Sequence, residues 1–111
     1  DALRRRGENI SSFEVESGVR SHPAVADCAV VGVRADEAAG EDEVMAFVVL
    51  KAGETASPED ICAWSEKELP AFMVPRYIDF IDELPQTATE KVRKKVLREQ
   101  GVTETTWDRL A

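Results

Sequence analysis

Residues that bind metals or form disulfides are scarce, with two cysteines and one histidine among 111 residues. Cys28 and Cys62 each stand alone in an apolar stretch, whereas a zinc site or a disulfide framework needs more ligands or more pairs. The acidic residues between positions 35 and 42 lack the glycine and glutamate placement of a calcium loop, so we expect a solvated loop there. The sequence therefore predicts no metal site.

Long apolar runs are also absent, although 43% of the residues are hydrophobic. No stretch approaches the roughly 18 residues that a membrane-spanning helix needs, and no signal peptide is visible. These features predict a globular domain without a membrane span, located in the cytoplasm. Because the chain begins at Asp1 without a methionine, we expect it to be a piece of a longer protein.

Basic residues are outnumbered, with 14 Lys and Arg against 22 Asp and Glu, which gives a net charge of −8. This balance argues against nucleic acid as the main partner, because neutralisation of phosphates dominates that kind of affinity. The positive charge is concentrated in two short zones, three arginines at 4–6 and five basic residues at 91–98. Two small basic zones on an acidic body suit a compact polyphosphate ligand better than a duplex.

The beginning of the chain has the pattern of a hairpin followed by a helix. Residues 2–6 read as a short strand, and residues 7–9 as a turn that leads into a second extended segment. Ser11 and Glu14 have capping-box spacing, so we expect a helix from about residue 12 to residue 21.

The rest of the chain alternates strands with helices. Residues 25–33 and 43–50 are apolar, β-branched runs of strand length, and they predict two buried, paired strands. Ser57 before a proline predicts the start of a second helix. Prolines at both ends of residues 70–75 predict a loop without regular structure, and residues 76–81 alternate as a third strand.

These elements predict an α+β fold class, with one domain over residues 1–111. The expected architecture is a small three-stranded sheet plus an N-terminal hairpin, covered by about three helices. Trp64, in the second helix, is expected to belong to the core. No element is predicted for residues 103–111.

The stretch with the most specific chemistry surrounds Lys91. Thr89 is a good N-cap, and apolar residues at 92, 96 and 97 recur at helical spacing, so a helix should begin within a residue of Lys91. A cation in a first turn opposes the helix dipole, and a bound phosphate or carboxylate would compensate for it. The alternative is that the basic run 91–98 is only the solvated face of a terminal helix.

This stretch resembles the final motif of the adenylate-forming superfamily. In that motif a Leu-Pro pair, a threonine-containing turn and a basic helix flank the adenylation lysine; Glu90 stands where glycine is most common. Four segments that precede it in the chain, at residues 1–16, 22–25, 46–50 and 75–77, also match the family and occur in the same order. The chain is thus similar to the mobile C-terminal domain of acyl-CoA synthetases, and its wording at residues 5–11 is closest to carnitine/crotonobetaine-CoA ligases.

For the first half-reaction, the resemblance implies that ATP and a small-molecule carboxylic acid form an acyl-adenylate and pyrophosphate. Lys91 matches the catalytic lysine of this step, where a fixed ammonium would lie between two anions. Magnesium and most ATP contacts are expected from an N-terminal adenylation domain outside this sequence. The acyl pocket is expected there too.

For the second half-reaction, the resemblance implies a rotated domain that helps to form the tunnel for coenzyme A. Gly7 matches the hairpin position whose backbone lines the tunnel, and Glu8 and Asn9 match polar positions beside it. Phe72 and Arg76 match positions that contact the nucleotide of coenzyme A, by stacking on adenine and by pairing with phosphate.

Val74 stands where some relatives carry a basic residue. On pattern alone, Phe72 would be read as a core residue and Arg76 as a surface residue.

Two alternatives stay open from the sequence. Within the enzyme class, the chain is also compatible with an adenylation enzyme that loads a carrier protein instead of coenzyme A. From another class, it is compatible with a stand-alone module whose basic helix binds an acidic protein or another polyanion. The ligase hypothesis predicts no turnover by residues 1–111 alone.

Overall fold

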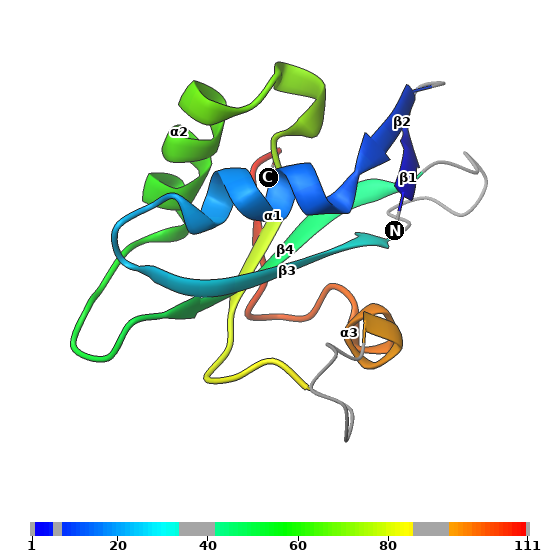
Figure 1. The fold of residues 1–111 in the computed structure, drawn as a ribbon. Helices are drawn as coiled ribbons and strands as arrows, with labels where there is room; N and C mark the ends of the chain where they lie inside the picture. The colour runs from blue at the N-terminus through cyan, green and yellow to red at the C-terminus, as the bar shows by residue number, and fades with distance from the viewer. Residues whose placement is uncertain (1, 6–7, 34–41, 86–93, 111) are drawn as a thin grey trace.

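The computed structural model describes residues 2–5, 8–33, 42–85 and 94–110, and for residues 2–5, 8 and 9 it describes the backbone only. The described elements follow one another along the chain as drawn in Figure 1. They are β1 (Ala2–Arg5), β2 (Glu8–Ser11), α1 (Ser12–Arg20), β3 (Val25–Val33), β4 (Glu43–Leu50), α2 (Pro58–Glu68), the 3-10 helix η2 (Ala71–Met73), β5 (Tyr77–Phe80), α3 (Lys94–Gln100) and β6 (Trp107–Asp108).

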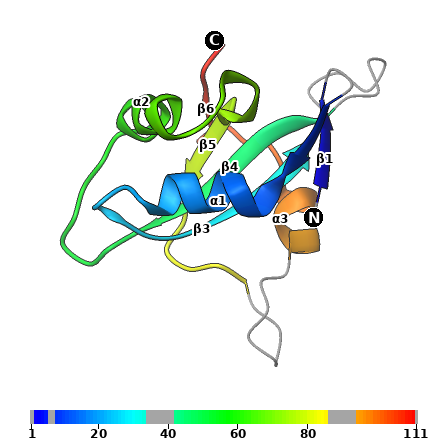
Figure 2. The same cartoon turned by 45° about the horizontal axis from the view of Figure 1, so that its top comes forward.

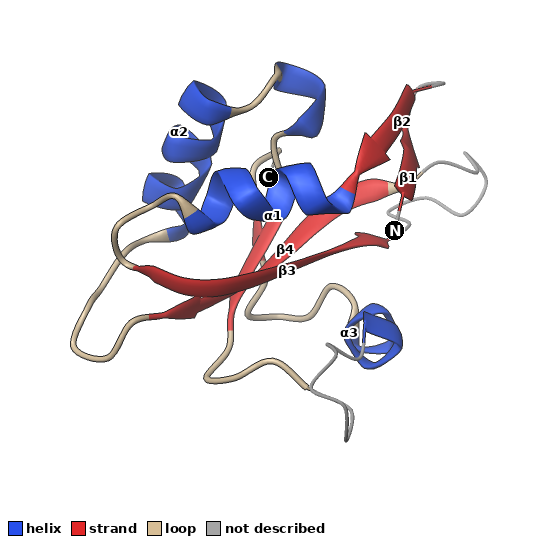
Figure 3. Ribbon diagram, viewed as in Figure 1, coloured by secondary structure: helices blue, strands red, loops and turns tan. Residues whose placement is uncertain are grey.

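The main sheet is mixed and has the strand order β3-β4-β5-β6. The β3–β4 and β5–β6 pairs are antiparallel, and the central β4–β5 pair is parallel. Because β4 and β5 are parallel, the chain must cross over between them, and it does so through α2 and η2. Figure 3 shows the sheet with its covering helices.

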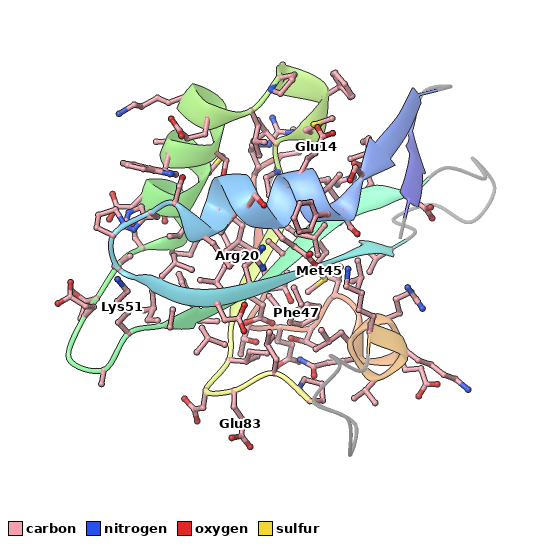
Figure 4. All side chains as sticks on the ribbon, viewed as in Figure 1. Glu14, Arg20, Met45, Phe47, Lys51 and Glu83 are labelled. Atoms are coloured by element: carbon pink, nitrogen blue, oxygen red, sulfur yellow. The ribbon has the colours of Figure 1, made fainter. Side chains whose placement is uncertain are left out.

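Both faces of this sheet are covered, which explains why β3 and β4 are apolar at nearly every position. Alternate residues of a strand point to opposite faces. On one face, Val30 and Ala46 join the buried cluster of α1 and α2, and on the other, Met45 and Phe47 join that of α3. Figure 1 shows α1 and α2 on one side of the sheet and α3 on the other. In Figure 4, Met45 and Phe47 lie on the α3 side.

The helix starts follow the signals in the sequence. Ser11 is the N-cap of α1 and accepts a hydrogen bond from the amide of Glu14 at 3.4 Å. Ser57 and Asp60 form a reciprocal capping box at the start of α2, with Pro58 in the first turn. Such caps satisfy amides that have no partner inside the helix, so these two predicted starts are confirmed.

The predicted N-terminal hairpin is confirmed, but its second strand begins earlier than expected, at Glu8. The partners Arg5 and Glu8 are the last pair of the antiparallel ladder between β1 and β2. Glu8 and Asn9 therefore belong to strand β2 and not to the turn. The strand conformation is favoured at Glu8 and Asn9 because each added residue pair of the ladder forms backbone hydrogen bonds that a turn would lack.

The segment for which no element was predicted forms the fourth strand of the sheet. Trp107 pairs with Ile78, and the hydroxyl of Thr106 donates to the buried carboxylate of Asp79 at 3.0 Å. The amide of Arg109 donates to the carbonyl of Arg76 at 2.8 Å. Figure 2 shows β6 beside β5 at this edge. A two-residue strand held by side-chain contacts leaves no periodicity in the sequence.

Two local predictions were wrong, the core position of Trp64 and the loop over residues 70–75. Trp64 is only partly buried, and its indole meets the ring of His22 edge to face at 5.2 Å between ring centroids. The buried residues of α2 are Ile61, Cys62 and Ser65. One 3-10 turn, η2, fits between the prolines at 70 and 75. On α3, Leu97 is buried but Val96 is 40% exposed. Successive residues of a helix point about 100° apart, so one of two neighbouring positions can be buried while the other is exposed.

Candidate functional site

The predicted site residues fall into three groups. Lys91 and Gly7 lie outside the described residues, as does most of the acidic loop between positions 35 and 42. Glu8 and Asn9 are described as backbone in β2. Phe72 and Arg76 are fully described, and they lie close in sequence at the crossover between α2 and β5.

Arg76 forms an ion pair inside the domain. Its Nε donates to Oδ1 of Asp108 at 3.1 Å and its Nη2 to Oδ2 at 3.2 Å, a bidentate contact between β6 and the residue before β5. A carboxylate oxygen of Glu43 lies 3.7 Å from Nη1, and the guanidinium lies over the ring of Tyr77 at 4.8 Å. The hydrogen bond with Arg76 lowers the pKa of Asp108, and the same bond raises the pKa of Arg76.

This arrangement differs from the surface position that the pattern alone suggested for Arg76. The side chains of Arg76 and Asp108 are only 20% and 24% exposed. A guanidinium has five N–H donors, and the bidentate contact uses two of them. Arg76 therefore has the geometry of a fork that binds an oxyanion, and in this structure the oxyanion is a carboxylate of the same domain.

Phe72 lies on η2 and is 37% exposed, so it is not a core residue. The neighbouring Val74 is buried, and a shallow pocket of about 170 Å³ opens beside it. This pocket is lined by Glu66, Ala71, Val74 and Arg109. The crossover thus presents one aromatic side chain and, nearby, the cations Arg76 and Arg109.

Sequence reasoning missed Asp108 and Arg109. Both come from the tail, where the only signal was a mixture of charged residues around Trp107. The Nε atom of Arg109 donates to the carbonyl of Pro75 at 3.3 Å. A partner that arrives from more than thirty residues away, on a strand of two residues, cannot be found from local pattern.

A second network of polar contacts lies at the β3 edge of the sheet. It includes Lys94, which comes three residues after Lys91 in the chain. The Nζ atom of Lys94, at the start of α3, lies 2.8 Å from a carboxylate oxygen of Glu16 in α1 and donates to the hydroxyl of Ser12 at 3.1 Å. The same oxygen of Glu16 accepts the amide of Val30 on the edge strand β3 at 2.8 Å. Ser12 is the first residue of α1, directly after the hairpin.

The two segments that carry Lys91 and Gly7 therefore lead into helices on opposite faces of the sheet. The helix after Lys91, α3, packs on the cluster that contains Phe47, whereas α1, after the hairpin, packs on the cluster that contains Val30. The beginnings of the two helices are nevertheless joined, because Lys94 reaches around the edge of β3 to Ser12 and Glu16. Lys91 and Gly7 themselves lie outside the described residues.

Within the described ranges, no group of three or more His, Cys, Asp or Glu side chains is arranged to hold a metal ion. Of the helices that the structure describes, none is long and apolar enough to cross a membrane.

The chain is similar to known proteins in family profile, in sequence and in fold. The sequence profile of a family described as "AMP-binding enzyme C-terminal domain" matches residues 14–91. A peroxisomal trans-cinnamate:CoA ligase from Petunia hybrida is 41% identical over 101 residues, which are 91% of this chain and 17% of that protein. A crotonobetaine/carnitine–CoA ligase from Salmonella arizonae is 35% identical over 96 residues, which are 86% of this chain and 18% of that protein.

Among solved structures, an acyl-CoA synthetase from Brucella canis superposes with a TM-score of 0.79 and 38% identity. It covers 90% of this chain, which in turn covers 19% of that chain. The chain thus spans less than a fifth of the length of these relatives. The identities of 41% and 35% to ligases of different acids do not single out one branch by this domain.

Proposed function

The chain belongs to the family of AMP-binding enzyme C-terminal domains, and on that premise we propose that it is the C-terminal domain of an ATP-dependent acyl-CoA ligase. The whole enzyme would join a carboxylic acid to the α-phosphate of ATP, with release of pyrophosphate. The thiol of coenzyme A would then attack the carbonyl of the acyl-adenylate, and AMP would leave. Cytoplasmic location stays a prediction, since a relative named above is peroxisomal.

In the first half-reaction, the role of Lys91 is electrostatic. A carboxylate and a phosphate must meet, and two unit charges at about 4 Å repel by about 4 kcal/mol at an effective dielectric constant near 20. An ammonium fixed between them removes this repulsion and stabilises the charge that develops in the transition state. No proton transfer by Lys91 is required.

The observation that carries this assignment is the place of Lys91 in the chain. The family match ends at residue 91, and the first described residue of α3 follows three positions later. Lys94 in turn binds α1 through Glu16 at 2.8 Å. The lysine thus comes three residues before Lys94, which ties the described start of α3 to the body of the domain. This place suits a residue that must be presented to another domain.

In the second half-reaction, the hairpin with Gly7, Glu8 and Asn9 would line the tunnel for coenzyme A after the domain has rotated. The absence of a side chain at Gly7 would let the pantetheine chain pass close to the backbone. Rotation about a hinge is a common way to present two surfaces to one site in turn.

The nucleotide of coenzyme A would bind at the crossover between α2 and β5. Phe72 is exposed enough to stack on adenine, and the fork of Arg76 matches a phosphate as well as a carboxylate. A phosphate at Arg76 would compete with Asp108 or share the guanidinium with it.

The full-length enzyme tests this proposal directly. Incubated with ATP, magnesium and a panel of carboxylic acids, it should release pyrophosphate, and coenzyme A should be consumed with formation of a thioester. Residues 1–111 alone should show neither activity, because the acyl pocket and most ATP contacts are assigned to the N-terminal domain. Transfer of the acyl group to a carrier protein in place of coenzyme A would instead favour the carrier-loading alternative.

The polyanion-binding alternative makes a different prediction for the 111-residue chain. It requires binding of a polyanion such as heparin or an oligonucleotide with micromolar affinity and strong salt dependence. The proposed function predicts no such binding. Tight, salt-sensitive binding by residues 1–111, together with no pyrophosphate release by the full-length protein, would overturn the ligase assignment.

A further inference from the structure

We infer that the ion pair between Lys94 and Glu16 is a positioning device for the adenylation step. It fixes the start of α3, and with it the chain three residues after Lys91, to α1 across the edge of the sheet. This inference rests on the proposed function. The proposed function assigns neither Lys94 nor Glu16 a contact with ATP or coenzyme A. The inference therefore adds two positioning residues to a site whose catalytic residue is Lys91.

The ion pair joins three elements at one point. Glu16 lies on α1, Lys94 on α3, and the amide of Val30 on the edge strand β3 donates to the same carboxylate oxygen that lies 2.8 Å from Nζ of Lys94. The side chains of Lys94 and Glu16 are only 18% and 11% exposed. An ion pair shielded in this way is much less screened by salt than a surface pair, and its geometry is narrow.

Stability alone does not explain why charged residues occupy these two positions. Removing two charges from water costs several kcal/mol per ion, and a well-packed apolar pair of the same volume is often about as stable as a buried ion pair. What the ion pair adds is direction, because the carboxylate must accept the Val30 amide and face Nζ at once. Directional contacts suit a segment whose position matters more than its stability.

The described part of α3 has fewer buried side chains than α1. Among the described residues of α3, only Leu97 is buried, and a helix of seven residues is not stable by itself. In α1, both Val15 and Val19 are fully buried in the larger cluster. Loss of the ion pair should therefore loosen α3 and leave α1, and the hairpin that precedes it, in place.

The test uses the full-length enzyme and both half-reactions. Lys94→Met keeps the length of the side chain without its charge, Lys94→Arg keeps the charge, and Glu16→Gln keeps an acceptor for the Val30 amide. The matched control is Arg20→Met, which removes another cation that pairs with an acid, Asp27, from the same helix as Glu16, at 3.7 Å and 36% and 45% exposed. Lys91→Ala serves as the reference for complete loss of the catalytic ammonium.

Lys94→Met and Glu16→Gln should each lower kcat for adenylation about 10- to 100-fold, because a displacement near 1 Å at a catalytic group costs about this much. The KM for the acid should stay within about twofold, and thioester formation from preformed acyl-adenylate should be nearly unchanged. Lys94→Arg should recover most of the rate. The double variant should lose little more than either single one, since the two residues act as one unit.

Hydrogen exchange supplies a readout that is independent of activity. In Lys94→Met, amide protection of residues 94–100 should fall, while that of residues 12–20 stays close to wild type. Equal losses in both half-reactions, no recovery with Lys94→Arg, or the same loss in Arg20→Met would overturn the positioning role. If Lys91→Ala spares adenylation, the proposed function fails, and unchanged protection of residues 94–100 in Lys94→Met would then overturn the present inference separately.

Discussion

The two faces of the sheet differ in how many side chains they bury. Among the described residues, the face under α1 and α2 holds a buried cluster of 14 side chains, whereas the face under α3 holds one of 8. Both α1 and α2 begin with side-chain caps, and each places at least two apolar side chains in the larger cluster. The helix α3 places only Leu97 in the smaller cluster and is joined to α1 by the Lys94–Glu16 pair.

This difference indicates which face supports the fold and which face presents a segment to another domain. The α1–α2 face carries the hairpin proposed for coenzyme A on a well-buried support, so its geometry follows from the fold itself. On the α3 face, the chain after Lys91 leads into a helix whose described residues include one buried apolar side chain, Leu97, and which Lys94 joins to α1. We therefore expect its position to depend on fewer residues than that of α1. Changes on the first face should act on the whole domain, and changes on the second should act on adenylation.

The largest effect is expected from Ile61→Ala on α2. Ile61 is fully buried in the larger cluster, and a buried Ile→Ala change costs about 3 kcal/mol, within a usual range of about 2–5. Urea unfolding of the 111-residue chain should show this loss, and both half-reactions of the full-length enzyme should fall together on heating. A loss confined to adenylation would break the comparison.

A smaller and more selective effect is expected from Leu97→Ala on α3. Leu97 is 2% exposed, and its truncation should cost about 2 kcal/mol, near the low end for a buried leucine because a short helix at the rim can relax. Adenylation should fall several-fold at temperatures where thioester formation from acyl-adenylate is unchanged. Equal sensitivity of the two steps would show that α3 is not specific to the first one.

Asp108→Asn sharpens the comparison at the opposite edge of the sheet. The Arg76–Asp108 pair is partly exposed, so its contribution should not exceed about 1 kcal/mol. If Arg76 exchanges Asp108 for a phosphate, the KM for coenzyme A should fall about two- to threefold, with adenylation unchanged. The control is Asp27→Asn, which removes the acid of the Arg20–Asp27 pair away from this edge. It should change neither the KM for coenzyme A nor the rate of adenylation. A higher KM in Asp108→Asn would mean that Asp108 orients Arg76 and does not compete for it.

The smallest effect at neutral pH concerns the two thiols, which both lie in the cluster under α1 and α2. Burial, and then the hydrogen bond with Glu66, raises the pKa of Cys62 from 9.0 to about 11. Burial raises the pKa of Cys28 further, with a smaller contribution from the carboxylate of Glu16. Neither thiol should react with an aromatic disulfide reagent at pH 8 in the folded chain. Ile61→Ala should make them react faster and Leu97→Ala should not.

The same thiols give a pH dependence with a definite sign. Between pH 9 and about 11 the unfolded chain loses the Cys62 proton while the folded chain keeps it. In this window the folded state binds more protons than the unfolded state does. The free energy of unfolding should therefore decrease as pH rises from 9 to about 11. Urea unfolding at several pH values, with Cys62→Ala as the control that flattens part of the slope, checks this prediction.

Much of the fold could be predicted because its signals are local. The caps at Ser11 and Ser57 and the apolar runs of β3 and β4 each fix one element within its own residues, and the bounds of both strands were predicted correctly. The parts that were missed depend on distant partners. The strand β6 exists because Thr106 binds Asp79 and Asp108 binds Arg76 across more than 25 residues.

The same reasoning applies to the candidate site. Arg76 could be singled out by resemblance to the family, but its carboxylate partner could not, since Asp108 comes from a tail without periodicity. Glu16 appeared only as one acid in a helix, although its side chain is buried against β3 and α3. The assignments of Lys91 and Gly7 to separate half-reactions stay predictions.

One measurement tests the division of labour most directly, namely both half-reactions in the full-length Lys91→Ala and Gly7→Trp variants. Lys91→Ala should lose several kcal/mol of transition-state stabilisation in adenylation, about 100-fold or more, and should convert preformed acyl-adenylate and coenzyme A to thioester at close to the normal rate. Gly7→Trp should release pyrophosphate normally and fail to form thioester, because its bulk blocks the tunnel. Equal losses in the two steps for Lys91→Ala would contradict the account.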